Sequence, residues 1–98
     1  MVKHVAIAKF KPSTSPATIT GIFTAIGRLR LTIPGIEDFS WGANNSPEGL
    51  SQGYTHGFSM TFKDVATRDN YLVHPEHVKV KEAAFAHLEG AIVFDYET

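Results

Sequence analysis

The residues of this chain that could do chemistry gather in one short stretch, YLVHPEHV, which begins at Tyr71 and carries His74 and His77. Imidazole titrates near neutral pH, so histidines serve as metal ligands or as general acids and bases. Pro75 opens a helix and leaves His74 outside it at the cap, and the chain has no cysteine and no clear third ligand nearby. The stretch therefore predicts acid and base chemistry at His77, a structural role for His74, and no metal site.

His77 and Tyr71 each have a chemical and a structural interpretation. A neutral imidazole could remove a proton from a carbon between two carbonyls, while the tyrosine hydroxyl held the carbonyl oxygen that gains negative charge. Lys81 follows one helical turn later and would lower the His77 pKa if its charge stays near; otherwise it projects into solvent. This chemistry needs no metal or organic cofactor. The structural alternatives are a histidine bonded to the backbone at a helix start and a buried tyrosine ring.

The elements that must position these residues follow a β-α-β-β-α-β order in one domain over residues 1–98. Strands are expected where short β-rich or alternating runs occur, at residues 2–10, 36–43, 54–62 and 91–96. Helices are expected behind the capping residues Ser15, Asp64 and His74, ending near residues 33, 72 and 88, with Gly90 as the last stop. The order predicts a ferredoxin-like α+β fold, in which helices cover one face of a four-stranded antiparallel sheet.

A cavity for a small molecule is expected between the sheet and the last helix. Residues three, seven and eleven positions after His77 are apolar, so this helical face points inward, and two alanines in the first strand leave space opposite it. The residues expected to contact a ligand there are His4, Ala6, Ala8, His56, Phe58, Val80, Lys81 and Leu88. For His4 and His56, a histidine whose hydrogen bonds are satisfied in the core is the alternative.

The opposite face of the sheet is predicted to be apolar too. Alternation places Val5, Ile7, Ile92, Phe94 and Tyr96 on that face, where a monomer would expose them as one hydrophobic patch. A 98-residue domain also has a small core of its own. A second copy of the same sheet is the simplest cover, so we expect a homodimer.

Composition excludes several classes of partner. Nine basic and ten acidic side chains, without a run of either sign, give no footprint for nucleic acid or an anionic membrane. No apolar run approaches the roughly 20 residues of a membrane helix, and the N-terminal residues show no signal-peptide pattern. These features predict a cytoplasmic protein with a hydrophobic small-molecule partner.

Four segments taken together, VKHVAIAKFK, IPGIEDFSWG, GYTHGFSMTF and YLVHPEHV, resemble the stress-responsive A/B barrel family, and in particular its polyketide cyclases. The resemblance covers nearly the whole chain and implies a dimeric α+β barrel with a pocket in each subunit. It implies that Tyr71 and His77 are the catalytic pair and that His4 and His56 lie in or near the cavity. The chain departs from the cyclase pattern at Ala6, Ala8, Ile26 and Lys81, which adds Ile26 to the expected ligand contacts.

The resulting functional prediction is a cofactor-independent enzyme that closes a poly-β-keto chain by intramolecular aldol condensation, with His77 as general base and Tyr71 orienting the carbonyl. One alternative is a non-catalytic stress-responsive barrel that binds a hydrophobic ligand. A second alternative is a cofactor-free monooxygenase with Trp41 or Tyr71 near an oxidisable phenol.

Overall fold

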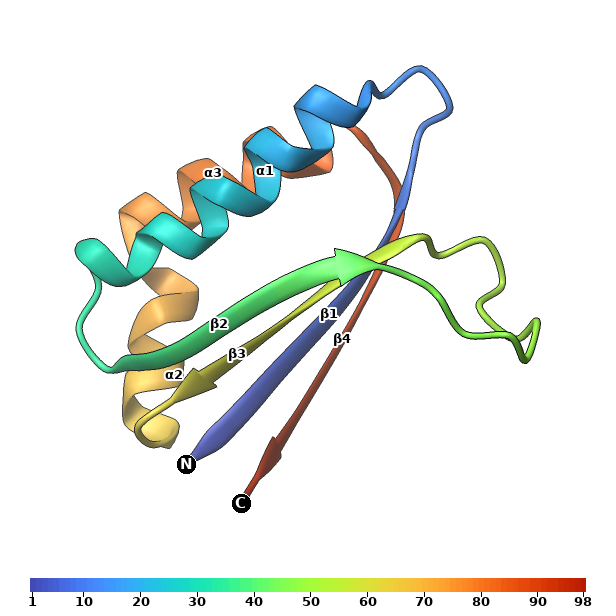
Figure 1. The fold of residues 1–98 in the computed structure, drawn as a ribbon. Helices are drawn as coiled ribbons and strands as arrows, with labels where there is room; N and C mark the ends of the chain where they lie inside the picture. Colours follow the sequence, from blue (N-terminus) through green and yellow to red (C-terminus); the bar gives the residue numbers. More distant parts are fainter.

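The computed structural model describes all residues, 1–98, and confirms the βαββαβ order of a ferredoxin-like α+β fold (Figure 1). The elements are β1 (Val2–Phe10), α1 (Pro16–Arg28), a short 3-10 helix η1 (Leu29–Leu31), β2 (Ile36–Ala43), β3 (His56–Phe62), α2 (Val65–Val73), α3 (Pro75–Phe85) and β4 (Leu88–Glu97).

The four strands form one antiparallel sheet in the order β2-β3-β1-β4. The helices lie on one side of this sheet, with α1 and α3 running beside each other (Figure 1). The two ends of the chain meet, because the Thr98 amide donates to the Met1 carbonyl oxygen at 2.9 Å. One face of the sheet therefore packs on helices, and the other has no cover within the chain.

Local capping chemistry starts each helix where the sequence predicts. The Ser15 hydroxyl accepts from the Thr18 amide at 3.1 Å, and Asp64 accepts from the Thr67 amide at 2.8 Å. His74 caps α3, since its Nδ1 accepts from the Glu76 amide at 3.1 Å. The structural role predicted for His74 is confirmed, and the cap fixes the entry of the helix that carries His77.

The main core lies at the end of the sheet where β1 begins. It consists of Val2, Leu29, Ile33, Met60, Phe62 and Tyr71, all nearly inaccessible to solvent. Next to it, α1 approaches the sheet closely at Gly27, where a Cβ atom would come within 2.8 Å of the Phe39 ring. A side chain at Gly27 would push the helix off the sheet, which explains a glycine inside a helix despite its unfavourable propensity.

The prediction that the last helix reaches Leu88 is wrong. The helix α3 ends at Phe85, and Leu88 already pairs with Phe10 as the first residue of β4. Gly90 is not a helix stop either; it lies in β4, where a Cβ would come within 2.9 Å of the Tyr54 hydroxyl. Pairing with β1 supplies ladder hydrogen bonds to residues 88–90, so these residues continue the sheet instead of the helix.

Two other boundaries differ from the sequence prediction. The third strand begins at His56 and not at Tyr54, whose ring instead lies 5.3 Å from the Lys9 amine. The first helix does not continue to residue 33 as one α-helix, because it tightens into η1 after Arg28. Neither change moves a residue of the chemical stretch.

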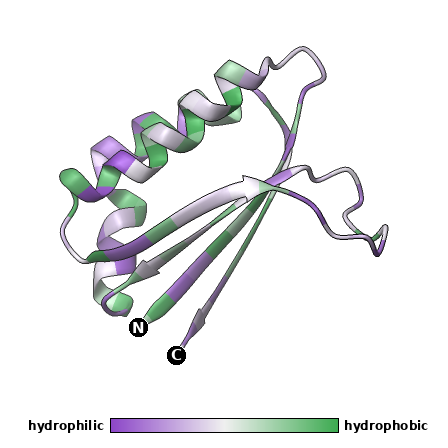
Figure 2. Cartoon of the chain, in the orientation of Figure 1, coloured by the Kyte–Doolittle hydropathy of each residue, from purple (hydrophilic) through white to green (hydrophobic).

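The uncovered face of the sheet is apolar along β1 and β4. Register places Val5 opposite Phe94 and Ile7 opposite Ile92, and the exposed fraction of the Phe94 side chain is 66%. Figure 2 shows hydrophobic segments on β1 and the helices and a largely hydrophilic loop after β2. We call Val5, Ile7, Ile92, Phe94 and Tyr96 the back-face patch.

None of the helices has the length and apolar character that a membrane span requires.

Candidate active site

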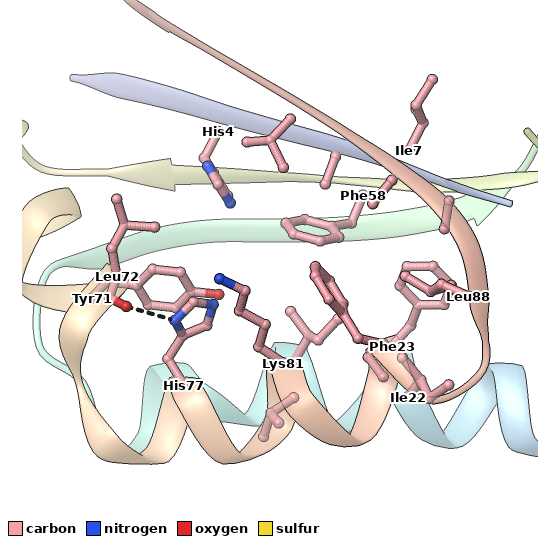
Figure 3. Close-up of a pocket in the computed structure, with 18 of the residues that line it drawn as sticks. His4, Ile7, Ile22, Phe23, Phe58, Tyr71, Leu72, His77, Lys81 and Leu88 are labelled. Carbon is pink, nitrogen blue, oxygen red and sulfur yellow. Dashed lines mark hydrogen bonds between the residues drawn. The ribbon is translucent and has the colours of Figure 1, made fainter. Parts of the chain in front are cut away.

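An apolar cavity of about 150 Å³ lies between the sheet and helices α1 and α3 (Figure 3). Of the nineteen residues that line it, sixteen are hydrophobic, and the three others are His4, His77 and Lys81. The large hydrophobic residues that line the cavity yet remain exposed mark where it opens; they are Ile7, Leu72, Phe85 and Val93. Apolar cavities of about 150 Å³ accommodate a molecule the size of benzene. A longer ligand would extend through the opening.

His77 stands at this cavity with a defined tautomer. It lies in the first turn of α3, and its Nδ1 is 3.3 Å from the Leu72 carbonyl oxygen. A carbonyl only accepts hydrogen bonds, so Nδ1 carries the proton and Nε2 of the neutral ring keeps its lone pair. Figure 3 shows Nε2 turned away from that bond, toward the cavity. His77 can therefore act as a base on a bound molecule.

The surroundings of His77 favour the neutral imidazole. Partial burial is the main reason that its pKa lies below the ordinary value, and the positive charge of Lys81 lowers the pKa further. The Leu72 carbonyl opposes these effects because it stabilises the protonated ring. The net pKa is still lowered, so the ring is unprotonated at neutral pH, as a base must be.

Tyr71 offers the complementary group. Its ring is 1% exposed, packs 4.9 Å from the Phe62 ring and lies 4.1 Å from the His77 ring. Burial raises the pKa of the phenol well above its ordinary value, so the hydroxyl keeps its proton. The Tyr71 hydroxyl makes no hydrogen bond within the chain. It is nevertheless not among fully buried, unsatisfied polar atoms, of which the chain has none, so it must be accessible from the cavity that Tyr71 lines. It can donate a hydrogen bond to a ligand oxygen.

His4 is a third polar group at the cavity, and the sequence analysis did not predict the contacts that hold it. His4 is 5% exposed, and its Nδ1 lies 2.7 Å from Asp95 Oδ1, while Asp95 Oδ2 accepts from Arg68 Nη1 at 2.9 Å. The carboxylate orients the imidazole with Nδ1 protonated and leaves Nε2 facing the cavity. The pairing of β1 with β4 brings these groups together, because it places His4 opposite Asp95.

The structure brings most of the predicted ligand contacts together. Those that line the cavity are His4, Ala6, Ala8, Ile26, Phe58, Tyr71, His77, Val80, Lys81 and Leu88, the last from β4 and not from a helix. The lining residues that the sequence analysis did not single out as contacts are Ile7, Phe10, Ile22, Phe23, Leu72, Ala84, Phe85, Ala91 and Val93. Most belong to the apolar faces of α1, α3 and β4, and their periodicity alone could not separate cavity wall from core.

His56 does not join this cavity, contrary to prediction. Its Nδ1 lies 2.8 Å from the Thr55 hydroxyl oxygen, and its ring packs against Phe10 and Phe23. These two aromatic rings line the cavity in its place, and the half-buried His56 borders a separate surface hollow with Tyr54 and Gly57. Trp41 is also outside the cavity wall, since it stacks on Phe23 at 4.7 Å. No three histidine, cysteine, aspartate or glutamate side chains are grouped as a metal site would require.

These features define a small α+β protein of ferredoxin-like fold, with an apolar cavity under its helices and with His77 and Tyr71 at the cavity wall. The chain belongs to the stress-responsive A/B barrel domain family, whose sequence profile matches residues 2–98. The resemblance seen in the sequence is thereby confirmed.

Two relatives are similar to this chain over nearly its whole length. A stress-response A/B barrel domain-containing protein of Arabidopsis thaliana, HS1, is 36% identical over 96 residues, which are 98% of this chain and 88% of that protein. Olivetolic acid cyclase of Cannabis sativa is 33% identical over 95 residues, which are 97% of this chain and 94% of the cyclase.

Solved structures agree with the fold. A crystal structure of an Arabidopsis thaliana protein, 36% identical, has a TM-score of 0.95 over 100% of this chain and 95% of its own. Hydroxynitrile lyase from Passiflora edulis has a TM-score of 0.89 at 27% identity, over 97% and 90% of the two chains. A dimeric ferredoxin-like protein of Jannaschia has a TM-score of 0.88 at 28% identity, over 99% and 98%.

Proposed function

We propose that this protein is a cofactor-independent enzyme of the polyketide cyclase type, which closes a poly-β-keto chain by intramolecular aldol condensation. The observation that carries the proposal is the His77 ring. The Leu72 carbonyl holds its Nδ1–H, so the lone pair on Nε2 is available beside an apolar cavity. The similarity to a cyclase over nearly the whole chain supports the same reaction class.

The proposed steps use only side chains of this cavity. His77 Nε2 takes a proton from a carbon between two carbonyls, and the electron pair moves onto an oxygen to give an enolate. The Tyr71 hydroxyl donates a hydrogen bond to that oxygen and stabilises its negative charge. The enolate carbon then attacks a second carbonyl carbon of the same chain and forms the ring bond. The new alkoxide takes back the proton from the His77 imidazolium, which restores the base.

The apolar wall contributes by holding the chain folded and dry. A ligand chain that fills the cavity beside Ala6 and Phe58 would be forced to bend back, because the cavity has a volume of only about 150 Å³. Exclusion of water strengthens the hydrogen bond from Tyr71 and slows competing hydrolysis. His4 presents a second imidazole on the sheet side, oriented by Asp95, where it can hold another oxygen of the ligand.

We also propose that the protein acts as a homodimer. The back-face patch would bury against the same patch of a second copy, as expected of a two-fold interface. The dimeric Jannaschia protein of similar structure supports this assembly.

The test is cyclisation of a triketide or tetraketide thioester, with products resolved by chromatography and mass. We expect His77→Ala to lower kcat/KM at least a hundredfold and Tyr71→Phe about tenfold to a hundredfold. His87→Ala is the matched control, because this histidine lies outside the cavity. If the parent protein gives the product mixture of the buffer alone, the cyclase proposal fails.

A non-catalytic role is the second candidate, and the composition of the cavity favours it. Sixteen hydrophobic lining residues suit retention of an apolar ligand without any reaction. This candidate predicts saturable binding of small apolar molecules that is unchanged in His77→Ala. Binding that persists in a protein without turnover would select it over the cyclase.

A further inference from the structure

Lys81 is an unusual member of the cavity wall. It lies one helical turn after His77 on α3, and it is the only lining residue with a permanent positive charge. Figure 3 shows the Lys81 side chain on the side of the cavity that also holds Tyr71 and His77, and the residue as a whole remains exposed to solvent. The polar end of this otherwise apolar site therefore carries a cation.

No carboxylate of the chain neutralises this charge. Two acidic groups of neighbouring elements have other partners, since Asp95 bonds to His4 and Arg68, and Glu76 bonds to Lys79 at 3.1 Å. Lys81 makes no salt bridge, and its amine lies 5.5 Å from the centre of the Phe85 ring at the opening. Its effect on the His77 pKa also shows that the charge is felt inside the site.

An unpaired cation at the rim of a low-dielectric cavity attracts an anion more strongly than the same cation in open solvent does. The apolar cavity favours a ligand with a hydrophobic body, and the Lys81 cation favours a ligand that also carries an anionic group. Tyr71 lines the same cavity as Lys81, and its hydroxyl can donate a second hydrogen bond to the anion.

We propose that Lys81 makes this site selective for carboxylic acids with a short apolar body, held with the carboxylate at the opening and the body beside Ala6 and Phe58. The inference rests on the proposed function only in placing a small molecule in this cavity. It adds the substrate class: the keto chain would be recognised by a terminal carboxylate, or the acid formed from it would be retained.

The experiment compares phenylacetate with phenylacetamide, which has the same shape and no charge. Affinities are measured by titration followed by amide NMR shifts, at low and at high ionic strength. We expect the parent protein to bind the acid about tenfold more tightly than the amide at low salt, with the difference shrinking as salt screens the charge. Lys81→Met keeps the apolar stem and removes the charge, so the acid should bind no better than the amide.

Two further variants make the outcome specific. Lys81→Arg should retain the preference, and Lys79→Met should leave it unchanged, because Lys79 bonds to Glu76 on the exposed surface. Lys81→Met should also raise the His77 pKa in an NMR titration, since a like charge is removed. Equal affinity of the parent for both probes, absence of binding in the cavity, or a preference that survives in Lys81→Met would each overturn the inference. Turnover of a neutral thioester tests the proposed function separately.

Discussion

The cavity is the feature on which the functional argument depends, and filling it gives the most direct test. Ala6 lies on the helix-facing side of β1, between Phe58 and Val93 in the sheet register, and lines the cavity. Ala6→Leu adds three carbon atoms at a point where the structure has about 150 Å³ of free space. We expect the new side chain to enter that space without displacing its neighbours, so that stability rises while ligand binding is lost.

The size of the effect follows from the burial of apolar groups. At about 0.8 kcal/mol per buried methylene, three carbons would contribute about 2.4 kcal/mol if fully buried. The cavity is partly open to solvent, so the new side chain is not fully buried and we expect an increase of about 1 to 2 kcal/mol in the free energy of unfolding. For a domain of this length, that raises Tm by roughly 5 to 15 °C.

The assay is urea unfolding and scanning calorimetry at one fixed protein concentration, because dimerisation makes apparent stability depend on concentration. Ala83→Leu is the matched control, since it adds the same atoms at an exposed position on α3 and should change stability by no more than about 0.5 kcal/mol. A loss of about 1 to 3 kcal/mol in Ala6→Leu would be the signature of overpacking. It would mean that side chains already fill this space, and the functional argument would fall.

Three other predictions test the charges and the surface. Turnover should rise with pH through the pKa of His77, which lies below about 6.5. It should then stay level beyond neutrality, because the Tyr71 phenol ionises only at very high pH. A decline between pH 7 and 9 would contradict this assignment. Phe94→Lys, which places a charge in the back-face patch, should convert the dimer to monomer in sedimentation equilibrium, and an unchanged mass would exclude that interface. Asp95→Asn should lower the free energy of unfolding by about 1 to 3 kcal/mol, because buried His4 loses a charged acceptor. The control is Asp69→Asn, which should lower it by less than about 0.5 kcal/mol because the Asp69 side chain is 61% exposed.

Local signals in the sequence predicted the elements well. The caps at Ser15, Asp64 and His74 were readable because each bond joins residues two or three positions apart. The alternation from His56 to Phe62 was readable because side chains of a strand point to opposite faces in turn. Such features depend on the nearest neighbours in the chain, so no tertiary information is needed to find them.

The sequence predictions failed where residues far apart in the chain decide the outcome. Residues 88–90 continue a helical pattern in the sequence, yet β1 offers them strand partners, and the strand wins. His56 shares a strand face with Phe58, yet the rings of Phe10 and Phe23, from other elements, line the cavity in its place. Neither outcome is encoded in the residues next to the position concerned.

The sequence by itself determined the order of strands and helices, the apolar character of both sheet faces and the pairing of Tyr71 with His77 in one segment, because periodicity and short-range spacing specify all three. Only the tertiary structure decided that free space remains under the helices, that Leu72 fixes the His77 tautomer, and that Arg68 and Asp95 hold His4. These depend on how closely separate elements approach one another. The packing of side chains from different elements sets that distance, and no single segment contains it.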